Sequence, residues 1–235
     1  MKKIIVFWLI LILPIFVLAQ EYEESNINLK IDVNDSFIVL SRDNLADNPD
    51  LEKLNLTEEN MKNIMEKNNI YFDIINNDVS YEIVIVVPQT KLDFDNLTEV
   101  NDLMLDNLKS ELVKKTGAQA SYIYKGNYNY VVVDYHDENS GYNVINYYTV
   151  MNKRGYNVQL QKKGEILEED KNNLREIVDS ISIKSLAKPK ENSNKVDNKK
   201  TIDVKIIICG VVIGAIAGVI TYYIGINIKK RKSSR

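Results

Sequence analysis

The sequence contains few of the residues from which cross-linked folds and metal sites are usually built. Its 235 residues include one cysteine, one histidine, nine glycines and four prolines. A single cysteine excludes a disulfide framework and a thiolate metal cluster, and a single histidine excludes most zinc sites. The scarcity of glycine and proline excludes a fibrous or linker-like protein. The sequence also has no serine nucleophile elbow, HExxH motif, phosphate-binding loop or GxGxxG motif, so it lacks the signatures of the common catalytic classes.

The charge of the chain is unevenly distributed. Apolar residues make up 45% and charged residues 27%, which excludes a disordered polyelectrolyte and allows one or two domains. The formal net charge is only −3, but residues 20–183 carry 16 basic and 30 acidic side chains, a net charge of −14. This excess argues against direct binding of nucleic acid or an anionic surface. It fits a basic partner, bound cations or simple solubility.

The N-terminus has the organisation of a secretory signal. Lys2 and Lys3 precede an uninterrupted apolar run over 4–19, and Val17 and Ala19 occupy the −3 and −1 positions of a cleavage site. We therefore expect a signal peptide over 1–19. An uncleaved N-terminal anchor is the alternative, and a lipoprotein signal is excluded because no cysteine follows the run.

A second apolar run, 206–226, has the length of a membrane span. Its 21 uncharged residues would form a helix of roughly 30 Å, the thickness of the bilayer's hydrocarbon core. Basic residues follow it directly, and such residues stay on the cytoplasmic side. They are Lys229, Lys230, Arg231, Lys232 and Arg235. We expect a single-pass protein of the cell membrane, with its large domain outside and a short tail, 227–235, in the cytoplasm.

Glycines recur along one face of this expected span. Gly210, Gly214 and Gly218 are four residues apart, and Gly225 follows seven residues later. Small residues at this spacing allow two helix backbones to approach closely. The pattern predicts a helix–helix contact with a second copy or another membrane protein, and chance composition is the alternative. Cys209 lies in the same span, where it serves as a small apolar residue.

A lysine-rich segment separates the span from the rest of the chain. Residues 184–205 contain seven lysines and three acids without hydrophobic periodicity, which is typical of a flexible stalk. The extracytoplasmic domain is therefore expected over 20–183.

This domain alternates strand and helix patterns. Strands are expected at 28–33, 36–40, 70–75, 81–87, 119–125, 128–135, 142–151 and 155–161, and helices at 58–68, 95–116 and 168–182. In 155–161, Tyr156, Val158 and Leu160 face one side and Asn157, Gln159 and Gln161 the other. Turns are expected at the polar and glycine-containing positions between strands, including Lys153-Arg154-Gly155. The pattern predicts an α+β fold, a largely antiparallel sheet with helices packed on it.

Three segments of the domain carry a resemblance to a known family. They are SFIVLSRDN, IYFDIINNDVSYEIVIVV and YYTVMNKRGYNVQLQKKGEILEEDKNNLREIVDSI. In this order of elements the region 28–183 resembles the PsbP-like fold, an α-β-α sandwich around an antiparallel sheet. The resemblance implies extracytoplasmic binding or assembly roles rather than catalysis. The excess of Asn, Lys and Ile is similar to that of single-span membrane proteins from low-GC Gram-positive bacteria.

Few side chains suggest chemistry. His136 follows Asp134-Tyr135 and precedes Asp137-Glu138, where a carboxylate could orient the imidazole for acid–base work. A histidine in an exposed loop is the alternative. Acids cluster at Asp43, Asp47 and Asp50 and at Asp93 and Asp95, but neither cluster has the spacing of a calcium loop. We therefore predict no catalytic residue, metal ligand or cofactor.

Tyrosines are concentrated in the later strands, where nine of the fourteen lie between Tyr122 and Tyr156. An exposed aromatic strip would suit a protein partner. We expect that surface at Tyr128, Tyr130, Tyr147 and Tyr148. Tyrosines half-buried under helices are the alternative.

Together these features favour a non-catalytic, membrane-anchored binding or accessory domain, acting as an adapter or sensor in a cell-envelope complex. Besides the lipid bilayer, its partner would be another envelope protein or a second copy, and nucleic acid is excluded. The alternatives are an envelope hydrolase with a carboxylate-based site and a calcium-responsive module.

Overall fold

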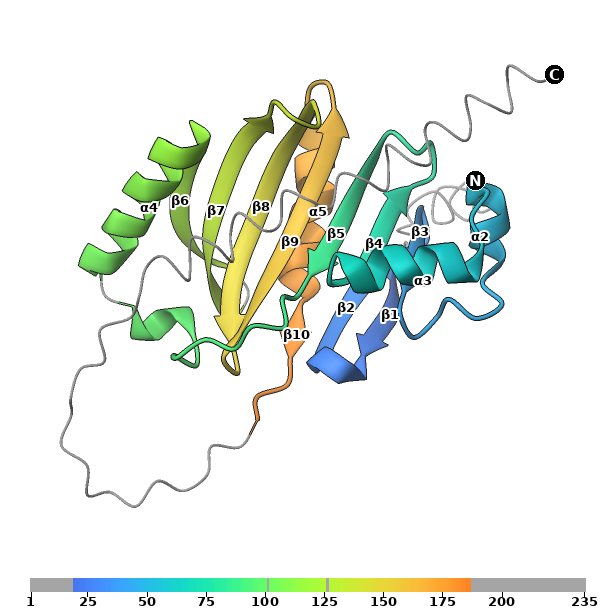
Figure 1. The fold of residues 1–235 in the computed structure, drawn as a ribbon, viewed down its shortest axis with the longest axis horizontal. Helices are drawn as coiled ribbons and strands as arrows, with labels where there is room; N and C mark the ends of the chain where they lie inside the picture. The colour runs from blue at the N-terminus through green and yellow to red at the C-terminus, as the bar shows by residue number, and fades with distance from the viewer. Residues whose placement is uncertain (1–18, 101, 126, 187–235) are drawn as a thin grey trace, which may run out of the picture.

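The computed structural model describes residues 19–100, 102–125 and 127–186 (Figure 1). The following expected segments lie outside these ranges: the signal peptide except its last residue, Ala19, the span with its glycine face, the basic tail, and all but the first three residues of the stalk. None of the helices in the described part of the chain has the length and hydropathy needed to cross a membrane.

Seven strands form the main sheet, in the order β3-β4-β5-β9-β8-β7-β6, and every neighbouring pair is antiparallel. The strands are β3 (Phe37–Ser41), β4 (Ile70–Asn76), β5 (Tyr81–Val86), β6 (Gln119–Lys125), β7 (Tyr128–Asp137), β8 (Tyr142–Met151) and β9 (Arg154–Lys163). All seven were expected from sequence, apart from shifts at their ends. The expected α+β fold with a largely antiparallel sheet is confirmed.

A second, smaller sheet has the order β1-β2-β10. Its strands are β1 (Ala19–Glu24), β2 (Leu29–Asn34) and β10 (Ser182–Ile183), and a 3-10 turn, η1 (Ser25–Ile27), connects the first two. The sequence analysis predicted only β2. The charged segment AQEYEE has no apolar alternation because β1 is an edge strand that pairs with β2 alone and is exposed along most of its length, and β10 is too short to give a pattern.

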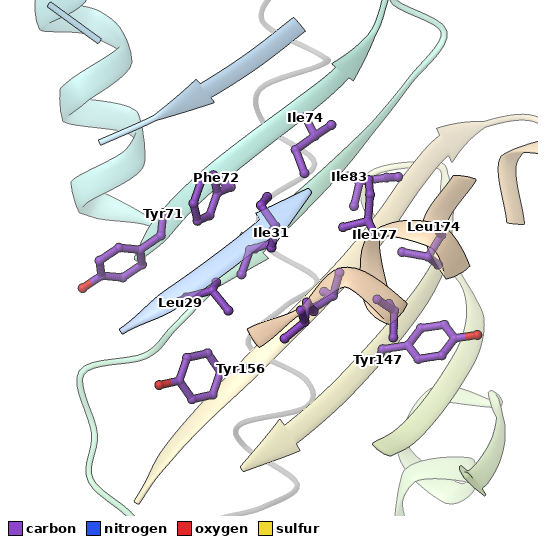
Figure 2. Close-up of a cluster of buried hydrophobic side chains, with 14 of the residues drawn as sticks. Leu29, Ile31, Tyr71, Phe72, Ile74, Ile83, Tyr147, Tyr156, Leu174 and Ile177 are labelled. Carbon is purple, nitrogen blue, oxygen red and sulfur yellow. The ribbon is translucent and has the colours of Figure 1, made fainter. Parts of the chain in front are cut away.

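Helices lie on both faces of the main sheet (Figure 1). α5 (Glu168–Ser180) covers one face together with the small sheet. α2 (Pro49–Leu54), α3 (Glu58–Lys67) and α4 (Asp102–Thr116) cover the other. Figure 2 shows the first face, where α5 and β2 contribute apolar side chains over those of β4 and β5. Alternation along each strand supplies both faces: Ile83 and Ile85 join this cluster, whereas Val84 and Val86 join the opposite one.

The second face is divided into two apolar clusters. One lies under α2 and α3 and includes Met61 and Met65; the other lies beside α4 and includes Leu105 and Leu108. Between them, on β4, β5, β9 and β8, the side chains are polar. They are Asp73, Glu82, Asn157, Gln159, Gln161 and Asn146. We call these six residues the polar band.

The single long helix expected over 95–116 is divided. A 3-10 turn, η2 (Leu97–Glu99), is followed by Val100 in an extended conformation and then by α4. Asn96 starts the turn because its side-chain oxygen accepts a hydrogen bond from the Thr98 N–H at 2.9 Å. Leu97 and Val100 still enter the same apolar cluster as Leu108, so the spacing predicted burial correctly but not the continuity of the helix.

The turn between β8 and β9 lies earlier than expected. Asn152 and Lys153 have φ values of 54° and 61°, whereas Arg154 and Gly155 belong to β9. Asn152 also holds the chain where it leaves the domain: its amide donates to the Lys184 carbonyl at 2.9 Å and accepts from the Leu186 N–H at 3.0 Å. This turn therefore lies at the end of the domain where the expected stalk would begin.

Candidate functional site

The four tyrosines expected to form a partner surface are buried. Tyr128 and Tyr147 are 8% and 7% exposed, and Tyr130 and Tyr148 are fully enclosed. The rings of Tyr130 and Tyr147 meet edge to face with centroids 5.8 Å apart, and the Tyr128 hydroxyl accepts a hydrogen bond from the Ile183 N–H at 2.7 Å. The prediction of an aromatic surface was wrong, and the alternative of tyrosines packed in the core is correct, because both faces of β7 and β8 are covered.

His136 is exposed on β7, with Nδ1 2.9 Å from the side-chain oxygen of Asn143 on β8. Within α2, Asp50 forms an ion pair with Lys53, and in the loop after β3 the Asp43 N–H donates to Glu24. Among the described residues, no three His, Cys, Asp or Glu side chains lie close enough together to hold a metal ion. The acidic clusters seen in the sequence are therefore not brought into one site.

A pocket of about 290 Å³ lies where β5 ends and β9 begins, beside η1. It is lined by Asn26, Tyr71, Val87, Pro88, Gln89, Lys91 and Arg154. Pro88 follows β5 and has no N–H for a strand ladder, so the chain leaves the sheet here. The departing loop is held at both ends, because the Val87 N–H donates to the Asn69 carbonyl at 3.0 Å and the Leu92 N–H donates to the Lys153 carbonyl at 2.8 Å.

The charge of this pocket is opposite to that of the domain. Its lining includes two cations, Lys91 and Arg154, and no carboxylate. Arg154 donates through Nη1 to the Asn26 carbonyl at 2.9 Å, which fixes its guanidinium beside η1. Among the side chains that the structure describes, neither cation forms an ion pair. An anion in the pocket would therefore not compete with an internal acid.

The aromatic wall of the pocket is held in place from behind. The Tyr71 ring is 9% exposed, and the Arg42 guanidinium lies 3.9 Å from its centroid. Arg42 is itself fixed by hydrogen bonds from Nε to the Ile70 carbonyl at 2.6 Å and from Nη2 to the Met65 carbonyl at 2.8 Å. In Figure 2 the Tyr71 hydroxyl points away from the apolar cluster. The ring thus offers a preformed surface at little conformational cost.

The polar band is the second group of functional candidates. Strand register places Glu82 beside Gln161, and Val84 between Asp73 and Gln159. All six side chains are at most 1% exposed. One internal contact is a hydrogen bond from the Asn146 amide to the Asn157 side-chain oxygen at 2.9 Å.

Asp73 is a strongly perturbed acid of this band. Burial raises the pKa of its carboxyl well above the usual range, and the charge of the neighbouring Glu82 and a hydrogen bond with its carboxyl raise it further. The raised pKa keeps a proton on Asp73, which does not line the pocket. Carboxylate-based hydrolysis needs access for water and substrate, and the side chains of Asp73 and Glu82 are enclosed.

Glu24 is a third buried acid, at the end of β1. Its Oε1 accepts a hydrogen bond from the Asp43 N–H at 2.9 Å, which ties β1 to the loop after β3. Burial is the largest cause that raises the pKa of Glu24 to about 7, although the hydrogen bond from Asp43 opposes it.

We expect Glu24→Gln to remove much of the domain's loss of stability between about pH 4.5 and pH 7. In this range the unfolded chain releases the Glu24 proton and the folded protein keeps it, so stability falls as pH rises and levels off above about pH 7. The difference corresponds to roughly 3 kcal/mol. Urea unfolding of the full-length protein in neutral detergent, followed by far-UV circular dichroism at several pH values, measures it.

Glu23→Gln is the matched control, because Glu23 is exposed and pairs with Lys30 on the surface. Its pH profile should follow that of the unmodified protein. An unchanged slope for Glu24→Gln would show that Glu24 ionises normally in the folded state.

No family model matches the sequence, and the search of curated proteins found no match. Among solved structures, the chain is similar to the solution structure of cyanobacterial PsbP (CyanoP) from Synechocystis sp. PCC 6803, with 10% identity and a TM-score of 0.40 over 72% of this chain and 94% of that one. It is also similar to a crystal structure from Bacteroides thetaiotaomicron VPI-5482, with 8% identity and a TM-score of 0.42 over 71% of this chain. This match spans only 48% of the Bacteroides chain. Both are similarities of fold alone, and the first is to the family that the sequence resembles.

Proposed function

We propose that this protein is a non-catalytic binding or accessory domain, held at the outer side of the cell membrane by its C-terminal span and acting as an adapter or sensor in an envelope complex. The observation that carries the proposal is the preformed pocket at the stalk end of the domain. Arg154 in its lining adjoins the Asn152 turn, which also holds Lys184 and Leu186 where the chain departs. A ligand in the pocket would therefore contact Arg154, close to the turn that anchors the exit of the chain.

The chemistry of the lining favours binding over catalysis. Amides, two cations, a phenol and two apolar side chains surround the pocket. General acid–base catalysis of hydrolysis usually relies on a carboxylate or an imidazole within hydrogen-bond reach of the substrate, and the described lining includes neither. Such a set can orient and retain a molecule, which is the role of an accessory subunit.

The proposal is tested by crosslinking with mass spectrometry on the full-length protein in its native membrane. A reproducible second protein joined to the domain, or to the segment bearing Gly210, Gly214 and Gly218, is the expected result. Replacement of Gly214 by isoleucine should abolish crosslinks through that segment, whereas Ile213→Leu should not. If the only crosslinks join copies of this chain, the protein is a homodimer rather than an adapter. If no crosslinks form, both the adapter and the homodimer are contradicted.

An envelope hydrolase is the second candidate. The raised pKa of Asp73 next to Glu82 is a feature of carboxylate-based sites, but the enclosure of both side chains counts against this candidate. It predicts that the purified protein releases fragments from isolated cell-wall polymer and that Glu82→Gln stops the release. A protein that leaves the polymer intact would remove this candidate.

A further inference from the structure

We propose that the pocket formed by η1, Tyr71 of β4, the end of β5 and the start of β9 binds a small soluble organic anion, with a carboxylate or phosphate group attached to a flat or apolar body. The inference deepens the proposed binding role by naming the class of ligand, and it rests on that role. Its anion-binding side is Lys91 and Arg154, and its apolar side is Tyr71, Val87 and Pro88.

The sign of the ligand's charge follows from the contrast between the pocket and its surroundings. Acidic side chains outnumber basic ones by 30 to 16 over residues 20–183, yet the lining of the pocket includes two cations and no acid. Some basic residues of the domain pair with its acids, as Lys30, Lys125 and Lys162 do. Lys91 and Arg154 line the same hollow, where together they can attract an anion.

The geometry of Arg154 leaves hydrogen-bonding capacity for a ligand. A guanidinium has five N–H donors in a planar fork that matches a carboxylate or phosphate. The structure assigns one of its nitrogens, Nη1, to the Asn26 carbonyl. This bond orients the plane and leaves other donors available. The amides of Asn26 and Gln89 in the same lining add donors of moderate strength.

The remaining walls define the body of the ligand. The Tyr71 ring cannot swing freely, because Arg42 lies against one of its faces and is itself held by two backbone carbonyls. Tyr71 and Val87 are 9% and 2% exposed, so with Pro88 they offer a small apolar patch in a mainly polar lining. This patch has room to contact one small flat or aliphatic group next to the anionic end of the ligand.

The size of the pocket and the charge of the domain select a free solute over a polymer or a membrane surface. A volume of about 290 Å³ is at the lower limit for small-molecule sites. A nucleic acid or an anionic bilayer would also meet the net negative charge of residues 20–183, which repels both.

The test is isothermal titration calorimetry of the full-length protein in neutral detergent at low salt, with phenyl phosphate and benzoate as probes and benzyl alcohol as the uncharged control. We expect one anion or both to bind with one site per chain, the alcohol not to bind, and affinity to fall as salt is added. Lys91→Gln should weaken binding at least tenfold. Arg154→Gln should weaken it further, and Arg154→Lys should restore part of the loss.

Lys153→Gln is the matched control, because Lys153 is an exposed cation next to Arg154 that does not line the pocket; it should bind as the unmodified protein does. Lys91 is exposed and forms no ion pair with another described residue, so we expect Lys91→Gln to fold normally. Circular dichroism checks that Arg154→Gln folds as well. Any of three results would overturn the inference: neither anion binds at 10 mM, Lys91→Gln and Lys153→Gln have equal effects, or the protein binds only to anionic lipid vesicles.

The crosslinking experiment distinguishes this inference from the proposed function. If a partner is crosslinked but no anion binds, this inference alone fails. If an anion binds but no partner is found, the adapter role fails.

Discussion

Replacement of Gly155 by alanine is expected to lower the domain's free energy of unfolding by about 2–3 kcal/mol, as overpacking in a well-filled core does. Gly155 lies in β9, and a Cβ placed on it would be 2.7 Å from both Cε2 and Oη of Tyr148. Tyr148 is fully buried in the cluster beside α4 with Val131 and Val150, so its ring cannot withdraw without moving these neighbours. Urea unfolding of the full-length protein in neutral detergent gives the change as a lower midpoint at an unchanged slope.

A double-mutant cycle separates this contact from a general intolerance of the strand. Tyr148→Leu removes the ring, and in that background Gly155→Ala should cost little. Tyr148→Phe is the matched control: it removes the hydroxyl but retains Cε2, so most of the cost of the alanine should persist. An equal cost of Gly155→Ala in all three backgrounds would show that the β9 backbone, rather than the Tyr148 ring, requires glycine.

The same glycine shows what local sequence could and could not predict. In sequence Gly155 follows two polar residues and is typical of a turn, which is how it was interpreted. Its actual requirement comes from Tyr148, which the β8–β9 register brings over it, with Gly155 directly opposite Val150. A glycine needed for a turn and one needed for close packing look alike until the pairing is known.

The alternation in β9 predicted a strand with an apolar and a polar side, and both are present. Nothing in the local pattern indicated that the polar side would be buried, because burial of Asn157 and Gln159 depends on the whole main sheet and the helices on its second face. The short charged β1 and the two-residue β10 were missed for a related reason: their positions follow from backbone pairing with β2, which leaves no periodic signature.

The pocket was likewise beyond reach of sequence patterns. The hydrogen bond from Arg154 to the Asn26 carbonyl joins residues 128 positions apart, and Tyr71 and Lys91 come from two further segments. No motif links them. The one available signal was weak: Pro88 indicated that the chain leaves the sheet after β5, but not which side chains would surround the exit.

Replacement of Asp73 by leucine is expected to raise the free energy of unfolding by roughly 2 kcal/mol at pH 8, because it removes a fully buried carboxyl that lies next to a second buried carboxyl, Glu82. Leu40 and Val84, the strand neighbours of Asp73, belong to the apolar cluster under α3 and can accept the new side chain. Burial and Glu82 raise the pKa of Asp73. The folded protein therefore keeps this proton where the unfolded chain releases it, and stability falls as pH rises from about 4.

The leucine variant should therefore gain more at pH 8 than at pH 4, and urea unfolding of the full-length protein at both values measures the difference. Asp73→Asn is the matched control, because it removes the titration but keeps a polar side chain: it should flatten the pH dependence with a smaller gain. Destabilisation by leucine at both pH values would show that Asp73 makes a stabilising contact. Stabilisation would instead show that this carboxyl lowers the stability of the fold, and positions of that kind are found where binding or proton exchange requires the group. The polar band would then be the next region in which to seek a ligand.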